Sequence, residues 1–148
     1  QFEKVGRRDK LGGRGVGAKK DVLEYFEFGD GAVNTFLEKQ AEINIKEAGR
    51  KLVKISHVAV MPLRDILASV GLGEGGIDLL SVDTEGMDLE VLRSLDWKKT
   101  RPEIVICEDL RFDLMNPKKS EVAKFLFELG YSLSAKTPYS LIFRDGRE

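Results

Sequence analysis

The stretch Ile77–Glu108 constrains the fold of this chain more than any other part of its sequence. It starts with an almost wholly apolar run, Ile77–Val82, as expected of a strand that is buried on both faces. An acidic turn, a helical stripe of apolar residues and a second apolar run, Glu103–Cys107, follow in that order. Strands that alternate with helices predict a parallel sheet. Asp83 follows the first of these strands and Glu108 follows the second. Because ligands bind beyond the carboxyl ends of parallel strands, these two carboxylates lie where a site is expected.

The same patterns extend the prediction along the whole chain. Alternating and apolar runs predict strands at Val22–Phe28, Leu52–Val60, Ile77–Val82, Glu103–Cys107, Tyr131–Ala135 and Tyr139–Phe143. Periodic stripes and capping residues predict helices from Asn34 or Thr35 to about Ala48, over Pro62–Val70, over Met87–Leu95, and from Pro117, capped by Asn116, to Leu129. The short link between the last two strands predicts an antiparallel pair. We therefore expect one α/β domain over residues 1–148, with a mostly parallel sheet covered by helices on both faces and one antiparallel strand from the C-terminal hairpin.

Composition narrows the class of protein. With 148 residues, 42% of them hydrophobic and 33% charged, the chain is large enough for a core and unlike a disordered segment. The formal net charge of −1 favours neither nucleic acid nor a membrane surface as a partner, and no apolar run is long enough to span a membrane. Cys107 is the only cysteine, which excludes a disulfide framework or a cysteine zinc site and suggests a reducing, cytoplasmic location.

Residues 1–20 differ from the rest of the chain. They hold seven Lys and Arg side chains against two acidic ones, a local balance of +5, and the glycines at positions 12, 13, 15 and 17 predict an irregular segment. Such a segment is compatible with a nucleic-acid-binding arm or with a solvated loop, and the sequence leaves both interpretations open.

Two glycine patterns and a single histidine do not form catalytic motifs. The GxGxxG pattern at Gly71–Gly76 follows a predicted helix and opens a predicted strand, the reverse of a dinucleotide-binding turn, so we interpret it as a helix cap and loop. Gly13–Ala18 matches loosely without a preceding strand, although its glycines and Arg14 could contact an anion. His57 lies within a predicted strand, where packing is a simpler interpretation than catalysis, and one histidine offers little to a zinc site.

The turn Asp83-Thr84-Glu85-Gly86 is the strongest candidate for a functional site. Helix capping would explain one of its acids, but not the second acid, nor Glu108-Asp109 at the end of the next strand. If the two strands are neighbours, four acids share one rim of the sheet. Such a cluster could hold Mg²⁺ or Ca²⁺, bind a cationic cofactor, or take a proton from an acceptor hydroxyl.

This region resembles the FkbM-type methyltransferase family. The acidic turn with its flanking strand and helix, residues 77–92, is the most specific part of the resemblance. Supporting matches extend it over about residues 21–145: Asn34-Thr35-Phe36, Met61-Pro62-Leu63-Arg64-Asp65-Ile66-Leu67, Arg101-Pro102-Glu103-Ile104-Val105 with Glu108, and Leu129-Gly130-Tyr131.

The resemblance implies a class I, S-adenosylmethionine-dependent methyltransferase with a Rossmann-like, three-layer α/β/α fold. Its usual activity is O-methylation of a sugar or another small-molecule hydroxyl. Residues 77–82 and 103–107 would be its fourth and fifth strands, and the final hairpin its sixth and seventh. On this basis Asp83 and Glu85 are the catalytic candidates, with Asp83 the first choice for the base. Asp83, Thr84 and Gly86 would adjoin the cofactor, Glu108 would lie on the substrate side, and no metal ligand is assigned.

The sequence departs from the family pattern in one respect. We find neither the glycine-rich turn that cradles the cofactor nor the acid that binds its ribose. Those units would occupy roughly 60–90 residues at about 30 per βαβ unit, and we expect them upstream of Gln1. The chain is thus expected to be a C-terminal part of a methyltransferase that binds S-adenosylmethionine weakly on its own. A non-catalytic α/β binding module and a metal-dependent hydrolase built on the acidic rim remain as alternatives.

Overall fold

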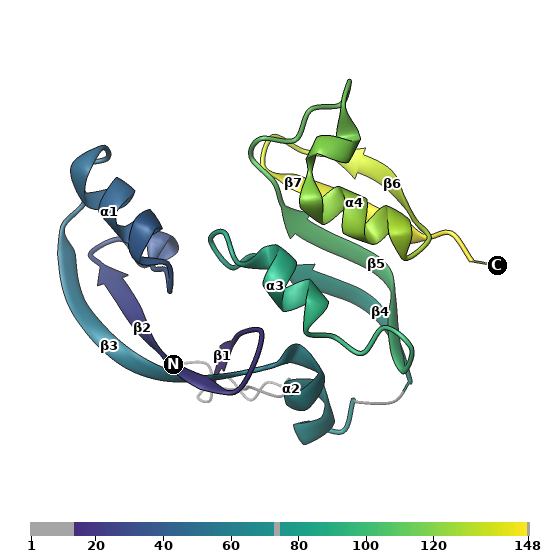
Figure 1. Ribbon diagram of the computed structural model, residues 1–148, viewed down its shortest axis with the longest axis horizontal. Helices are drawn as coiled ribbons and strands as arrows, with labels where there is room; N and C mark the ends of the chain where they lie inside the picture. The colour runs from purple at the N-terminus through teal and green to yellow at the C-terminus, as the bar shows by residue number, and fades with distance from the viewer. Residues whose placement is uncertain (1–13, 73–74, 148) are drawn as a thin grey trace, which may run out of the picture.

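The computed structural model describes residues 14–72 and 75–147, which form two β-sheets and four α-helices (Figure 1). The first sheet has the order β1-β3-β2 and consists of β1 (Gly15–Val16), β3 (Leu52–Met61) and β2 (Asp21–Phe28). The second has the order β4-β5-β7-β6 and consists of β4 (Gly75–Val82), β5 (Thr100–Glu108), β7 (Ser140–Asp145) and β6 (Tyr131–Lys136). The helices are α1 (Glu38–Lys46), α2 (Leu63–Ser69), α3 (Asp88–Arg93) and α4 (Glu121–Glu128), with 3-10 turns η2 (Gly31–Val33) and η3 (Pro117–Lys119). None of the helices in these described ranges is long and apolar enough to cross a membrane.

The second sheet confirms the strand–helix–strand prediction. β4 and β5 run parallel, with Leu80 opposite Val105 and Val82 opposite Cys107, and α3 lies between them in the chain. β7 pairs antiparallel with both β5 and β6, so the C-terminal hairpin places one antiparallel strand within this sheet, as expected. Because two of the three strand pairings in the sheet are antiparallel, a mostly parallel sheet is not confirmed.

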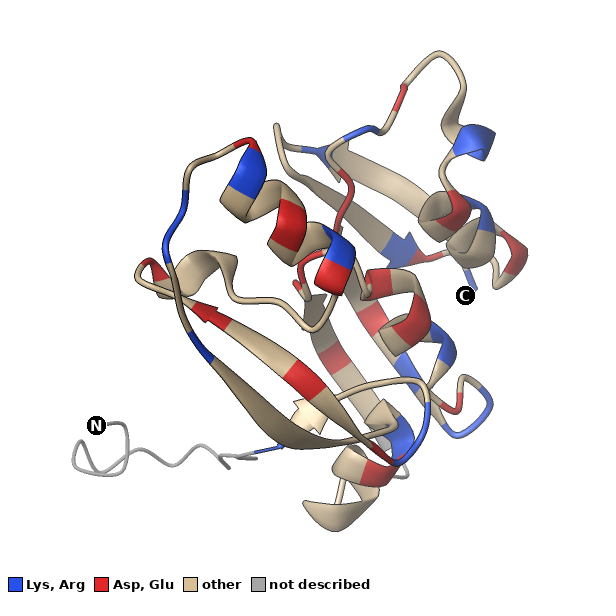
Figure 2. Cartoon of the chain, turned by 60° about the vertical axis from the view of Figure 1, so that its left-hand side comes forward, with Lys and Arg blue, Asp and Glu red and all other residues tan. Residues whose placement is uncertain are grey.

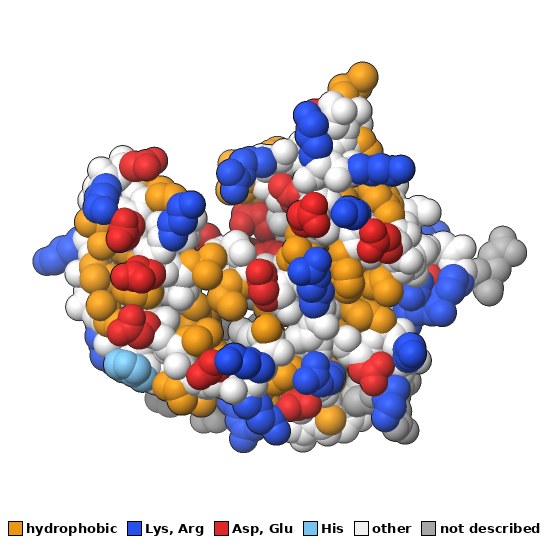
Figure 3. Space-filling model, viewed as in Figure 1, with side chains coloured by type: hydrophobic (Ala, Val, Ile, Leu, Met, Phe, Trp, Pro, Cys, Tyr) orange, Lys and Arg blue, Asp and Glu red, His pale blue; other side chains and the backbone are white. Residues whose placement is uncertain are grey.

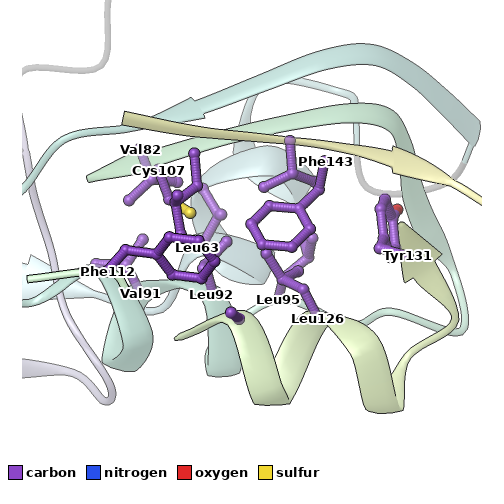
Figure 4. Packing of buried hydrophobic residues seen from close by; sticks show 13 residues of the cluster. Leu63, Val82, Val91, Leu92, Leu95, Cys107, Phe112, Leu126, Tyr131 and Phe143 are labelled. Atoms are coloured by element: carbon purple, nitrogen blue, oxygen red, sulfur yellow. The ribbon is translucent and has the colours of Figure 1, made fainter. Parts of the chain in front are cut away.

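The main core lies between the second sheet and the helices α3 and α4 (Figure 4). Leu92 of α3 and Leu126 of α4 are fully buried on one side of it, and Phe143 of β7 is fully buried on the other. Burying one such side chain stabilises a fold by about 1.5–3 kcal/mol. This core therefore fixes the strands whose ends carry the acidic residues.

The opposite face of the second sheet is more open. Leu79 is 52% exposed there, and Ile104, Ile106 and Ile142 are partly exposed. Within the described ranges, helices pack on one face of this sheet only, so the three-layer α/β/α arrangement stays a prediction.

The position of β3 corrects one expectation from the sequence. The alternation of elements predicts a single, mostly parallel sheet, but β3 lies in the separate first sheet, where it pairs antiparallel with β2. The reason is that the chain doubles back after β2, where Thr35 forms a β-bridge with Phe26. Helix α1 then returns the chain to the end of β2, where the amide of Gly29 donates to the carbonyl of Lys51 (3.3 Å). A strand that starts beside the end of its neighbour has to run antiparallel to it.

Two helices begin later than their predicted caps. Asn34 is part of the turn before α1, and its Oδ1 accepts a hydrogen bond from the amide of Phe28 (2.8 Å). The cap of α4 is Ser120 instead of Asn116, because Ser120 Oγ accepts a hydrogen bond from the amide of Ala123 (3.0 Å). The segment after Asn116 forms the 3-10 turn η3.

The glycines of the two rejected motifs have structural roles where they are described. A Cβ on Gly15 would lie 2.7 Å from Val60 Cγ1, so β1 can approach β3 only with a glycine at this position. Gly71 has a φ of +77° directly after α2, which confirms its predicted role at the end of that helix. Residues 1–13 and 73–74 lie outside the described residues, and with them most of the basic segment and the middle of the GxGxxG pattern.

Candidate functional site

The turn between β4 and α3 has an unusual backbone. Glu85 has a φ of +49°, which places a residue with a side chain in the left-handed region, and Gly86 follows with a φ of +99°. A Cβ on Gly86 would lie 3.1 Å from Leu37 Cδ1, so the turn packs against the start of α1. Such conformations persist where the surrounding structure holds them, and they are concentrated at functional sites.

A buried carboxylate holds this turn against the end of β5. Asp88, the first residue of α3, is 4% exposed. Its Oδ2 accepts hydrogen bonds from the amide (3.3 Å) and the hydroxyl (3.0 Å) of Thr84. Its Oδ1 accepts a hydrogen bond from the amide of Glu108 (3.0 Å). The β4–α3 turn and the end of β5 are therefore joined through one side chain, and Figure 2 shows acidic segments meeting in this part of the molecule.

A cavity of about 300 Å³ opens at the carboxyl ends of β4 and β5, which is at the lower end of the range for small-molecule sites. In Figure 3 acidic side chains gather in the hollow between the part of the molecule that carries α1 and the part that carries α4. The cavity is lined by the acids Glu85, Asp88, Glu108, Asp109 and Glu121, by Gly86, Gln40 and Arg111, and by the apolar Leu89, Leu110 and Val122.

Burial raises the pKa of Glu85, and the nearby charges of Asp83 and Asp88 raise it further, while Arg50 acts in the opposite direction. Burial also raises the pKa of Glu108, with further contributions from the acids around it: Asp83, Glu85, Asp88 and Asp109. Neither carboxylate has a hydrogen bond or an ion pair with another described residue. Two carboxylates with raised pKa and no partner give the cavity a negative potential suited to a cation or to accepting a proton.

The structure brings three of the predicted site residues to this cavity and places two beside it. Glu85, Gly86 and Glu108 line the cavity. Asp83 is exposed at the end of β4 without lining the cavity, and Thr84 contributes through its hydrogen bonds to Asp88. Sequence reasoning missed the part played by Asp88, by Glu121 of α4, and by Gln40 and Arg111. The signal in the sequence for Asp88 was an acid at the start of the predicted helix, four residues after Thr84. Its burial could not be predicted, because it depends on the contact with β5.

Other candidate residues lie apart from this site. His57 is exposed on β3 opposite Glu24 and does not line the cavity, so the structure does not confirm the packing role expected from the sequence. Cys107 is fully buried, and burial raises its pKa to about 12, so a thiolate nucleophile is not available at neutral pH. In residues 14–72 and 75–147, no group of three His, Cys, Asp or Glu side chains could hold a metal ion.

Comparison with protein families decides the class of protein. The model of the methyltransferase FkbM domain matches residues 5–133 of the chain. The chain belongs to this family. The match confirms the resemblance drawn from the acidic turn, and it indicates a methyltransferase-type function for the FkbM domain described here. Neither the curated proteins nor the solved structures that were compared with the chain include a match.

Proposed function

We propose that this FkbM domain acts in the transfer of a methyl group from S-adenosylmethionine to a small-molecule hydroxyl, such as that of a sugar. The observation that carries the proposal is the cavity at the ends of β4 and β5, which Glu85 and Glu108 line with carboxylates that have no partner among the described residues. Family membership supports methyl transfer, and the position beyond parallel strands is where α/β enzymes bind ligands.

The charge of this site fits the proposed cofactor. S-adenosylmethionine carries its methyl group on a positively charged sulfur and would supply that group when bound. Asp83, Glu85 and Glu108 form a negative surface on which a cation is favourable, because nearby acids raise the pKa of Glu85 and Glu108 in addition to the effect of burial. We assign Asp83, Thr84 and Gly86 to the cofactor side of the site.

The chain's own residues would align the acceptor and remove its proton. In the transfer, the acceptor oxygen would form a bond to the methyl carbon as the bond from that carbon to the cofactor's sulfur breaks, the sulfur keeping the electron pair, and the hydroxyl proton would pass to a carboxylate of the site. Glu85 is well suited to this role because it lines the cavity and its pKa is raised, which makes its ionised form a stronger base. Asp83 was the first choice from the sequence, but it does not line the cavity. Glu108 would orient the acceptor from the other side.

The test measures release of S-adenosylhomocysteine when the protein is given methyl-labelled S-adenosylmethionine and a panel of sugars and other small hydroxyl compounds. Loss of a general base typically costs 10²–10⁴-fold, so we expect Glu85→Gln to reduce turnover on the order of 10²-fold or more. Asp83→Asn should reduce turnover mainly by weakening the binding of S-adenosylmethionine. Both variants should unfold at close to the wild-type temperature, because neither side chain has a partner in the described structure. Asp78→Asn, on the strand β4 that precedes both residues and away from the cavity, is the matched control.

Two results would contradict the proposal in different ways. Wild-type turnover in both Glu85→Gln and Asp83→Asn would remove these residues from the reaction. Because the chain is expected to bind S-adenosylmethionine weakly, this assay uses a large excess of the donor, and a wild-type protein that then transfers no labelled methyl group to any acceptor of the panel would contradict the function itself.

A further inference from the structure

Asp88 does not use its carboxylate in the way that an acid at the start of a helix usually does. An acidic residue in the first turn commonly interacts with the free amides of its own helix. Both oxygens of Asp88 instead accept hydrogen bonds from outside α3, namely from Thr84 in the preceding turn and from Glu108 on β5. The burial of Asp88, at 4% exposure, therefore serves a contact between two separate segments.

Each of these contacts replaces one that the sheet cannot provide. β4 ends at Val82, which lies opposite Cys107, so no residue of β4 lies opposite Glu108. The amide of Glu108 donates to Asp88 Oδ1 instead. The amide and hydroxyl of Thr84 likewise lie past the end of β4 and share Oδ2. Without Asp88, partly buried donors in both segments would lose their protein acceptor.

We propose that Asp88 is the positioning residue of the site, whose buried carboxylate fixes the turn that carries Glu85 relative to the strand end that carries Glu108. Glu85 and Glu108 lie 23 positions apart in the chain, and Asp88 is hydrogen-bonded on one side to the turn of the first and on the other to the backbone of the second. The inference rests on the proposed function for its catalytic consequence, but the contact itself can be tested without a substrate.

The charge of Asp88 gives this role a signature that a merely structural contact lacks. Burial is the main cause of the raised pKa of both Glu85 and Glu108, and Asp88 is among the acids that raise each further. The pKa of Glu85 also responds to the charges of Asp83 and Arg50. The pKa of Glu108 also responds to the charges of Asp83, Glu85 and Asp109. Two further charged residues, Arg111 and Glu121, line the cavity. Removing the negative charge of Asp88 should therefore lower the pKa of both glutamates.

The first experiment follows the carboxyl carbons of Glu85 and Glu108 by ¹³C NMR while the pH is varied. In Asp88→Asn we expect both titration midpoints to move to lower pH, and the amide of Glu108 to exchange with solvent faster than in the wild type. Glu90→Gln is the matched control, because it removes an exposed charge from the same helix without a contact to either segment. Unchanged midpoints together with wild-type exchange of the Glu108 amide would overturn the proposal.

The second experiment connects positioning to catalysis and covers the case in which Asp88→Asn does not fold. Thr84→Val removes only the hydroxyl donor and leaves the charge of Asp88 in place. We expect kcat to fall on the order of tenfold with little change in the KM for the acceptor, since small misplacements of reacting groups have large effects on rate. In Asp88→Asn the acidic limb of the rate profile should also move to lower pH. A wild-type kcat in Thr84→Val would count against the proposal, whereas absence of methyl transfer in the wild type would contradict the proposed function and leave the NMR result standing.

Discussion

The two ends of the second sheet use acidic residues in opposite ways. At the end where β5 begins, Asp145 forms two hydrogen bonds with Arg101 (2.7 and 2.8 Å), and the Arg101 side chain also donates to the carbonyl of Leu129 (2.6 Å). The guanidinium lies 4.6 Å from the centre of the Tyr131 ring. At the end where β5 finishes, Glu85 and Glu108 have no such partner among the described residues.

The pKa values follow this difference. The hydrogen bonds from Arg101 lower the pKa of Asp145 to about 2, whereas burial and neighbouring acids raise the pKa of Glu85 and Glu108. Paired charges at one end stabilise the fold, and unpaired charges at the other end reduce stability at neutral pH. The direction of the carboxyl pKa shift therefore distinguishes the structural Arg101–Asp145 ion pair from the candidate site more clearly than the presence of acids alone.

The largest expected effect concerns the paired end. Arg101 and Asp145 are only 12% and 17% exposed, and Arg101→Met would leave Asp145 with the exposed Arg147 side chain, 3.5 Å away, as its ion-pair partner. The substitution should therefore cost about 3 kcal/mol in the free energy of unfolding, the low end for breaking a buried ion pair. That loss corresponds to a fall in melting temperature of roughly 6–12 °C for a chain of this size. Arg144→Met is the control, since its ion pair with Glu103 is exposed and should contribute at most about 1 kcal/mol. Equal falls in the melting temperature of the two variants would show that the Arg101–Asp145 ion pair contributes no more to stability than the exposed pair.

The next effect compares two glycines with positive φ, one at each end. Gly86 (φ +99°) belongs to the acidic turn, and Gly130 (φ +84°) follows α4 beside Arg101. Alanine is strained at such angles, so each Gly→Ala substitution should cost about 1 kcal/mol of stability. Only Gly86→Ala should also reduce methyl transfer, by up to about 100-fold, because it moves the turn that carries Glu85. If Gly130→Ala reduced turnover as much as Gly86→Ala, the two ends would not differ in function.

Sequence patterns predicted the second sheet well and the first poorly. The apolar runs of β4 and β5 are local signals, and they placed Glu85, Gly86 and Glu108 at one rim of the sheet. The partition into two sheets depends instead on the reversal of the chain at Thr35, a tertiary contact with β2 that leaves no periodic signal. Partner choice between strands is decided by such contacts, which a pattern of period two cannot specify.

The faces of α1 show the same limit. The spacing of the apolar residues Leu37, Ala41, Ile45 and Ala48 in the sequence predicts that they share one face of this helix. The buried residues are instead Ala41 and Asn44, while Ile45 is 42% exposed. Asn44 is buried because its Nδ2 donates to the carbonyl of Val33 (3.1 Å) in the preceding turn. The role of Asp88 was not predicted for a related reason, because its partner on β5 lies 20 residues away in the chain.

The smallest expected effect is on the pH dependence of stability, which should have opposite signs at the two ends of the second sheet. The pKa values of Glu85 and Glu108 are raised in the folded state, so their contribution to stability is full below their ordinary pKa of 4.5 and is lost as the pH rises through the folded value. Glu85→Gln and Glu108→Gln should therefore stabilise the protein at pH 7, by up to about 0.5 kcal/mol, and this gain should vanish below pH 4.5. Asp145→Asn should do the reverse, because its lowered pKa gives stability above its ordinary value of 3.8 that is lost as the pH falls through about 2. Denaturant unfolding of the three variants between pH 2 and pH 7 measures both trends. A loss of stability at pH 7 in both glutamine variants would mean that the carboxylates of the cavity stabilise the fold.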